Sequence, residues 1–211
     1  MTISSTLTKT DGAAPTRRQV VLGGLAAIGA TAFGIAPAAA FAVADARRLI
    51  DTVVADVNSV IASGKSEAAM LRDFEALFAR HADVATIARS ALGPAARTAS
   101  AGDMQAFTRA FQGYIARKYG RRFREFIGGQ IEVMDARPIR SYYEVITLAR
   151  LRGQSPFDLR WHVSDRGGRP MFFNIIIEGV NMLAAERTEI QSMLDRRRGN
   201  IPALIQDMNA L

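Results

Sequence analysis

Few side chains in this chain of 211 residues have types and spacings suited to metal or nucleophilic chemistry. Only two histidines occur, His81 and His162, and neither belongs to a metal-ligand spacing such as H-x-x-x-H. Cysteine is absent, which excludes disulfides, thiol nucleophiles and thiolate metal sites. The sequence also lacks G-x-S-x-G, Walker and dinucleotide-binding motifs. We therefore expect no metal ion, no cofactor and no catalytic residue.

The remaining candidates for acid–base catalysis are His162, Asp158, Glu144 and Glu178. Isomerase or dehydratase chemistry needs such a group inside an apolar pocket, where loss of solvation displaces its pKa. His162 and Asp158 lie on the opposite face of a strand from Trp161, which we expect to be the outward face. We expect Glu178, at a strand end, to cap the following backbone or to pair with an arginine such as Arg187. An enzyme is therefore the less favoured hypothesis.

Apolar side chains, in contrast, recur at regular spacing. We expect Asp103 to be the N-cap of the longest helix, which should end at Gly128-Gly129. Its apolar stripe, which should face the interior, consists of Met104, Phe107, Phe111, Tyr114, Ile115, Tyr119, Phe123 and Phe126. The strand expected at 157–164 alternates cleanly and places on one face Phe157, Leu159, Trp161 and Val163.

The other elements follow from the same periodicities. Helices are expected at 45–61, from Ser66, from Asp83 to Gly93, at 183–197 and at 202–209. Strands are expected at 130–136, 141–151 and 170–177, in addition to 157–164. Helices first, strands second and helices last predict an α+β domain, with helices packed on one face of a curved antiparallel sheet of about four strands.

The N-terminal segment has the pattern of an export signal. Arg17 and Arg18 directly precede an apolar run, 20–36, that is rich in Gly and Ala. This pattern predicts a cleaved twin-arginine signal peptide, with candidate cleavage sites after Ala38, Ala40, Ala42 and Ala44. A permanent N-terminal anchor is the alternative, which the glycines of the run and Pro37 disfavour. We therefore expect a signal peptide at 1–44 and one periplasmic domain at 45–211.

The chain is basic, with 27 Lys and Arg residues against 20 Asp and Glu. Much of the excess lies in two clusters, one of Arg117, Lys118, Arg121, Arg122 and Arg124 and one of Arg196, Arg197 and Arg198. Such patches attract nucleic acid, anionic headgroups or an acidic protein, or are simply solvated helix faces. Because the chain is expected to be exported, we expect no nucleic-acid partner.

The C-terminal segment 172–211 resembles a known family. An apolar strand runs into Glu178-Gly179-Val180, a helix carrying Arg187 follows, and Gly199-Asn200 opens a terminal helix. This order resembles the C-terminal pattern of the MlaC family, also called toluene-tolerance (Ttg) proteins, in which EGVS precedes an arginine-bearing helix and G-x-x-x-L-I-x-x-L. Asn181 replaces the usual serine. Further similarities lie at 87–93, at 107–119 and at 142–148, so the resemblance covers essentially the whole chain after the signal segment.

One departure from the family pattern limits what is carried over. The family often has W-x-I/V-x-D before the EGVS segment, whereas this chain has Pro170 or Met171 at the Trp position and Asn174 at the aspartate position. A role of that aspartate is therefore not carried over to this chain.

The resemblance implies a cone-shaped, NTF2-like arrangement with an apolar cavity between sheet and helices. It also implies a monomeric periplasmic carrier of phospholipid, bound as cargo. Its implied partners are an inner-membrane ABC transporter complex with an MCE component and an outer-membrane lipoprotein complex, both docked transiently. The aromatic stripe would then line the cavity. The side chains expected to bind lipid are Phe107, Phe111, Tyr114, Ile115, Tyr119, Tyr143, Val145, Phe157, Leu159, Trp161, Val163, Phe173, Ile175 and Ile177.

Three alternatives stay open at this point. An NTF2-like cavity enzyme of the isomerase or dehydratase type would act on a small apolar substrate. A carrier of hopanoids would use the same cavity for a sterol-like lipid. An adaptor with a filled core would bind only proteins and would have no void larger than a few waters.

Overall fold

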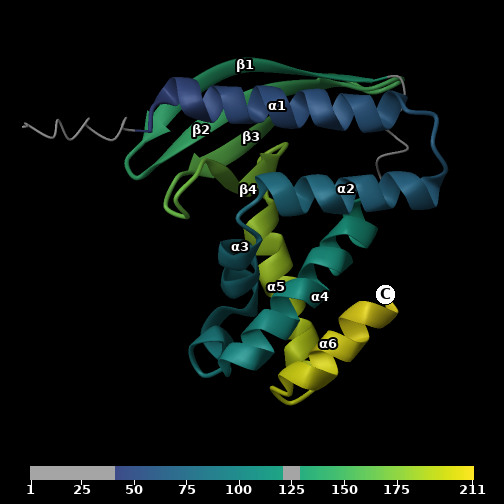
Figure 1. Cartoon of the computed structure of the whole chain (residues 1–211), viewed down its shortest axis with the longest axis vertical. Helices are drawn as coiled ribbons and strands as arrows, with labels where there is room; N and C mark the ends of the chain where they lie inside the picture. The colour runs from purple at the N-terminus through teal and green to yellow at the C-terminus, as the bar shows by residue number, and fades with distance from the viewer. Residues whose placement is uncertain (1–40, 121–128) are drawn as a thin grey trace, which may run out of the picture. The chain divides into compact units, whose positions relative to one another are not determined.

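The computed structural model describes residues 41–120 and 129–211 (Figure 1). The export segment expected at 1–44 thus lies almost entirely outside the described residues, as do Phe123 and Phe126. The elements in chain order are α1 (Val43–Ala62), α2 (Glu67–His81), α3 (Val84–Leu92), the 3-10 helix η1 (Gly93–Arg97), α4 (Ala101–Gly120), β1 (Gln130–Ile139), β2 (Tyr142–Arg150), β3 (Phe157–Ser164), β4 (Met171–Ile177), β5 (Val180–Asn181), α5 (Met182–Arg196) and α6 (Ile201–Ala210).

The strands form one antiparallel sheet in the order β1-β2-β3-β4-β5. Each strand pairs with the next in sequence because short turns connect them, which is the expected meander. The sheet remains open and gains a short fifth strand, β5, that the sequence did not predict. An α+β protein with an antiparallel sheet, as predicted, is confirmed.

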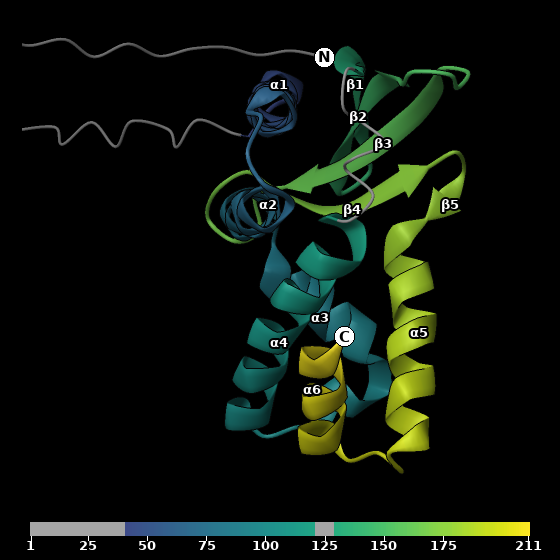
Figure 2. The ribbon, with the colours of Figure 1, turned by 90° about the vertical axis from the view of Figure 1, so that its right-hand side faces the viewer.

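The helices pack against the sheet and against one another in two groups. Helix α1 lies along the sheet, mainly on β1 and β2, and buries Ile50, Val53 and Val57 against it (Figure 1). Helix α2 packs beside α1 and also contacts α4. In the second group α3 packs on α5 and α4 packs on α6, and α5 joins this group to β4 (Figure 2).

Short polar side chains define where several helices begin. Ser66 and Asp83 cap α2 and α3 as expected, because their side-chain oxygens accept from the backbone N–H groups of Ala69 and Thr86. Asp103 was expected to cap α4, but Ser100 does so instead. Ser100 directly precedes this helix, and its hydroxyl accepts from the N–H of Asp103 at 3.0 Å. Asp103 therefore lies in the first turn, where its carboxylate accepts from the Ser100 hydroxyl at 2.7 Å.

The helical group has a filled core away from the sheet. Phe107 and Phe111 of α4 are fully buried, with ring centroids 5.8 Å apart. Leu92, Ile190 and Leu204 are fully buried in the same cluster and come from α3, α5 and α6. Close packing of this kind holds these helices together without disulfides.

Candidate ligand-binding pocket

A pocket of about 530 Å³ lies between the sheet and the helices. It is lined by residues of α1, α2, α3, α4, β1, β3, β4, β5 and α5, with further contributions from the loop between β2 and β3. In Figure 2, α5 descends from β5 on the opposite side from α2 and α4. The volume falls in the range of roughly 300–1,000 Å³ that is usual for small-molecule sites.

The walls of the pocket are almost entirely apolar. Beta-strands supply Leu159, Trp161 and Phe172, and α2 supplies Phe74, Leu77 and Phe78 on the facing side. An interior of this kind suits hydrocarbon, because every CH₂ removed from water contributes about 0.8 kcal/mol.

Trp161 is held in the wall by two specific contacts. Its indole Nε1 donates to the Thr147 hydroxyl at 3.0 Å, and its ring meets Phe172 edge-on at a centroid distance of 5.2 Å. Both Thr147 and Trp161 are buried, so the indole N–H has its partner and the rest of the ring presents apolar surface.

Exposed lining residues mark where the pocket reaches the surface. Gln154 from the loop between β2 and β3 and Val180 from β5 both line it, and Val180 is 55% exposed. Glu178 lines the pocket in the turn between β4 and β5, where Glu178 and Gly179 both have positive φ. This tight turn reverses the chain and sends β5 back along β4.

A polar cluster occupies the edge of the pocket between α4 and α5. Glu186 is buried, and its Oε1 accepts from Lys118 Nζ at 2.7 Å and from the Tyr119 hydroxyl. Lys118 also donates to Glu189, which accepts from the Tyr114 hydroxyl at 2.6 Å. Of these five residues, Tyr119 and Glu186 line the pocket itself.

The polar cluster shifts the pKa of several of its members. Burial, reinforced by the carboxylates of Glu189 and Glu186, raises the pKa of Tyr114 and Tyr119 well above the ordinary value. Burial alone would lower the pKa of Lys118, but its hydrogen bonds to Glu186 and Glu189 outweigh burial and raise it. Lys118 is therefore cationic, and both tyrosines are neutral hydrogen-bond donors.

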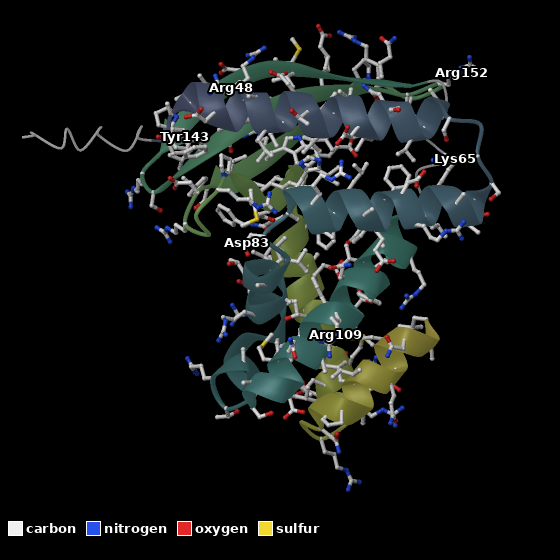
Figure 3. All side chains as sticks on the ribbon, in the orientation of Figure 1. Arg48, Lys65, Asp83, Arg109, Tyr143 and Arg152 are labelled. Carbon is white, nitrogen blue, oxygen red and sulfur yellow. The ribbon has the colours of Figure 1, made fainter. Side chains whose placement is uncertain are left out.

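Eight of the residues expected to bind lipid line this pocket. They are Ile115, Tyr119, Phe157, Leu159, Trp161, Phe173, Ile175 and Ile177. The other expected residues lie elsewhere among the described ones: Phe107 and Phe111 in the helical core, Val145 and Val163 fully buried in the sheet, and Tyr114 bonded to Glu189. Tyr143 lies beside the beginning of α1 and donates to the Phe41 carbonyl at 2.8 Å (Figure 3).

Sequence reasoning missed much of the helical side of the pocket. Val53 and Val57 of α1, Phe74 and Leu77 of α2 and Leu183 of α5 all line it. The residues of α1 and α2 have amphipathic spacing, but the same spacing serves a filled core equally well. Only the placement of the helices relative to the sheet distinguishes the two.

The candidates for acid–base chemistry do not gather in the pocket. His162 lies on the face of β3 opposite Trp161, as expected, but that position is buried rather than exposed. Its ring lies tilted against the ring of Tyr142, with the centroids 4.6 Å apart. Its Nε2 is 3.6 Å from Glu144 Oε2, and its Nδ1 is 3.3 Å from Asn174 Nδ2. Burial, which outweighs the nearby Glu144 carboxylate, lowers the pKa of His162. Neither His162 nor Glu144 lines the pocket.

The remaining titratable candidates lie apart from one another. Asp158 pairs with Arg160 at 2.8 Å on the outer face of the sheet. Glu178 is exposed, and within the described ranges it forms no ion pair with Arg187, which corrects that expectation. His81 is buried and bonds Asp56 at 2.9 Å.

Residues 41–120 and 129–211 contain no group of His, Asp and Glu able to hold a metal ion. No helix within these ranges is long and apolar enough to cross a membrane.

Fold and pocket together define a small α+β protein with an apolar pocket between its sheet and its helices. The family model described as MlaC protein matches residues 47–210, so the chain belongs to the MlaC family. The resemblance found in the C-terminal segment is thereby confirmed. No curated relative matches the chain.

A solved structure has the same fold. It is the phospholipid-binding protein from Ralstonia solanacearum, in complex with a phospholipid. The two chains align with a TM-score of 0.68 at 17% sequence identity, over 79% of this chain and 96% of the other. At this identity the likeness establishes the fold.

Proposed function

We propose that this protein carries phospholipid through the periplasm, with the acyl chains in the apolar pocket. The observation that supports this most directly is the pocket of about 530 Å³ with apolar walls, in a member of the MlaC family. The related fold from Ralstonia solanacearum, in complex with a phospholipid, supports the same cargo.

The energetics explain why a carrier is needed and why it needs no catalytic residue. Two acyl chains of roughly fifteen carbons each would cost about 24 kcal/mol to expose to water, at about 0.8 kcal/mol per CH₂. An apolar interior replaces one hydrocarbon environment with another, so transfer from membrane to protein is close to neutral and reversible. Binding and release are then sufficient for function.

The alternatives have less support. An adaptor with a filled core requires no void beyond a few waters, whereas this pocket is many times the roughly 30 Å³ that one water occupies. A cavity enzyme requires an acid–base group facing the substrate, whereas His162 and Glu144 lie outside the pocket lining. Of the two carboxylates in the lining, Glu178 is exposed in a turn and Glu186 is bonded to Lys118 and Tyr119. A hopanoid carrier would use the same pocket walls. Mass spectrometry of the lipid extracted from the protein distinguishes a hopanoid from a phospholipid.

Export and partners extend the proposal. We propose a twin-arginine signal peptide, a monomeric periplasmic protein, and transient docking to an inner-membrane ABC complex with an MCE component and to an outer-membrane lipoprotein complex. Membership of the MlaC family supports this route. Light scattering of the purified mature protein should give the mass of one chain.

Contacts at the start of α1 favour cleavage after Ala40 over cleavage after Ala44. The Phe41 carbonyl accepts from Tyr143 at 2.8 Å, the two rings meet edge-on at 4.9 Å, and the Ala42 N–H donates to Asp45 at 2.8 Å. Cleavage after Ala40 keeps these contacts, whereas cleavage after Ala44 removes them. We therefore expect the intact mass of the exported protein to correspond to an N-terminus at Phe41, and a mass beginning at Asp45 would contradict this.

A transfer assay tests the function itself. Donor vesicles containing a fluorescent phospholipid and unlabelled acceptor vesicles are mixed with increasing amounts of protein. We expect the transfer rate to rise in proportion to protein concentration. Transfer no faster than the spontaneous rate would argue against a carrier.

A further inference from the structure

Two hydrogen bonds link a buried histidine of the sheet to the wall of the pocket. His162 of β3 has its Nδ1 3.3 Å from the side-chain Nδ2 of Asn174 on β4. The Oδ1 of Asn174 accepts from the backbone N–H of Leu183, in the first turn of α5, at 3.1 Å. Asn174 and Leu183 both line the pocket, whereas His162 does not. The histidine is therefore connected to the pocket wall through one asparagine.

This network assigns the hydrogen-bonding role of each atom of the His162 ring. A backbone N–H can only donate, so the amide oxygen of Asn174 faces Leu183 and the amide NH₂ faces His162. The Nδ1 of His162 is then an acceptor and carries no proton. The proton of the neutral ring lies on Nε2, which is 3.6 Å from Glu144 Oε2.

The surroundings of His162 keep the ring neutral at neutral pH. On β4 it faces Asn174 and Phe173, which do not titrate. The titratable and charged side chains around it are Arg137 of β1, bonded to Glu144 at 2.5 Å, Tyr142 and Glu144 of β2, and the pair Asp158 and Arg160 of β3. Burial outweighs the Glu144 carboxylate and lowers the pKa of His162, so the ring takes up a proton only in acid.

Protonation of His162 conflicts with the bond between Asn174 and α5. An imidazolium carries an N–H at both ring nitrogens, so Nδ1–H and the Asn174 NH₂ would be two donors without an acceptor. Asn174 can offer its oxygen to the imidazolium by turning its amide over, but its NH₂ then faces the N–H of Leu183. In either arrangement one hydrogen bond of the network is lost.

We propose that neutral His162 holds the first turn of α5 against the sheet through Asn174, and that protonation of His162 loosens this turn and weakens lipid binding. The turn matters because Leu183 lies in it and Glu186 follows on the same helix, and both line the pocket. His162 is a positioning residue in this scheme, since it acts through Asn174. The inference rests on the proposed function and adds a pH dependence to it.

The test measures lipid binding at two pH values. Wild-type protein is incubated with phosphatidylcholine vesicles that contain a fluorescent phosphatidylcholine, whose headgroup charge is constant over this pH range. Affinity should fall about fivefold between about pH 7.5 and about pH 5.0, the equivalent of one ordinary hydrogen bond, and should recover when the pH is restored.

Three variants separate the histidine from other titrating groups. His162→Gln cannot titrate, so the fall should disappear. Asn174→Asp keeps an oxygen for the Leu183 N–H and replaces the amide NH₂ by an acceptor, which an imidazolium satisfies, so the fall should disappear here also. His81→Gln is the control: His81 bonds Asp56 and lies outside the pocket lining, so this variant should keep the wild-type fall.

A second measurement needs only the wild-type fold. Because binding and protonation are linked reciprocally, bound phosphatidylcholine should lower the pKa of His162. An NMR titration of the two histidine rings, with and without lipid, measures this, since His81 and His162 are the only histidines of the chain.

The outcomes separate this inference from the proposed function. Equal affinity at the two pH values, or an equal His162 pKa with and without lipid, would overturn the inference and leave the carrier function intact. A fall of wild-type size in folded His162→Gln or folded Asn174→Asp would also overturn it. Wild-type protein that binds no lipid at either pH would overturn the carrier function and this inference together.

Discussion

Apolar side chains of this protein belong to two groups that differ in what surrounds them. Phe111 is fully buried in the helical core with Phe107. Ile177 is only partly buried and borders the pocket. Shortening a core side chain leaves a cavity and loses contacts, whereas a pocket wall already borders open space. Substitutions in the two groups should therefore affect different properties.

Phe111→Ala should lower the free energy of unfolding by about 3–5 kcal/mol, the usual cost of truncating a buried phenylalanine. Lipid bound per folded molecule should stay at the wild-type level. Ile177→Asp should show the reverse, with lipid load falling several-fold and stability changing by about 1 kcal/mol, because it places a charge in an apolar site that is open to water. Urea denaturation and mass spectrometry of extracts measure the two properties, and an equal loss of lipid in both variants would contradict the division into core and pocket.

His162 gives stability a specific pH dependence. Its pKa in the folded protein is lowered from the ordinary 6.5, so the unfolded chain takes up the proton more readily. The contribution of a neutral His162 is therefore complete above about pH 6.5 and decreases as pH falls below it. Glu189, whose carboxyl pKa is lowered from 4.5, loses its contribution only at more acidic pH.

His162→Gln cannot titrate, so it should reduce the loss of unfolding free energy between about pH 7.5 and about pH 5.5. Glu189→Gln is the matched control and should leave that window unchanged while altering the dependence below about pH 4.5. Chemical denaturation at a series of pH values makes the measurement. A wild-type stability that is flat or rises as pH falls from 7.5 to 5.5 would refute the assigned direction.

At the scale of elements, two asparagines position α5 beneath the sheet. The Asn181 side chain caps the helix by accepting from the Ala184 N–H at 3.1 Å. Asn174 of β4 accepts from the Leu183 N–H at 3.1 Å, which ties the first turn of α5 to the sheet. Because Leu183 and Glu186 line the pocket, this tie also positions one wall of it.

Asn181→Ala should lower the free energy of unfolding by about 1 kcal/mol because it removes the N-cap. Asn181→Ser, which introduces the residue usual at this position of the family pattern, should stay within about 0.5 kcal/mol of wild type since serine caps equally well. Thermal unfolding followed by circular dichroism compares the two. A serine variant as unstable as the alanine variant would show that the cap hydrogen bond is not the cause.

The sequence predicted elements well where the apolar periodicity is strong, and less well where the hydrogen-bonded pairing of neighbouring strands is irregular. The strand at 157–164 was predicted with the bounds of β3, because Phe157, Leu159, Trp161 and Val163 alternate cleanly. The burial of His162 was not predicted, because it depends on an irregularity in the pairing of β3 with β4. Between His162 and Val163 the register shifts, so that Phe173 is an extra residue on β4, and the Phe173 ring lies 5.8 Å from the His162 ring. Strand β5 was missed because Val180 and Asn181 are too few to show a period.

At the scale of the whole molecule, the pocket depends on where helices lie relative to the sheet. The sheet side was largely predicted, since Leu159, Trp161, Ile175 and Ile177 all line the pocket. The contribution of α2 was not, because Phe74 and Phe78 have the spacing of an ordinary core face. Likewise Phe107 and Phe111 were expected in the cavity but fill the core between helices. Periodicity identifies buried faces, but it does not tell a filled interior from a hollow one.

The carrier account is tested most directly by the contents of the pocket. The protein, purified without detergent, is extracted with organic solvent, and the extract is analysed by mass spectrometry. We predict close to one glycerophospholipid per chain from wild type and several-fold less from Ile177→Asp. Recovery of a hopanoid instead of a phospholipid would keep the carrier function but change the identity of its cargo. An extract without lipid, from folded protein whose melting temperature is unaffected by added phospholipid, would contradict the account.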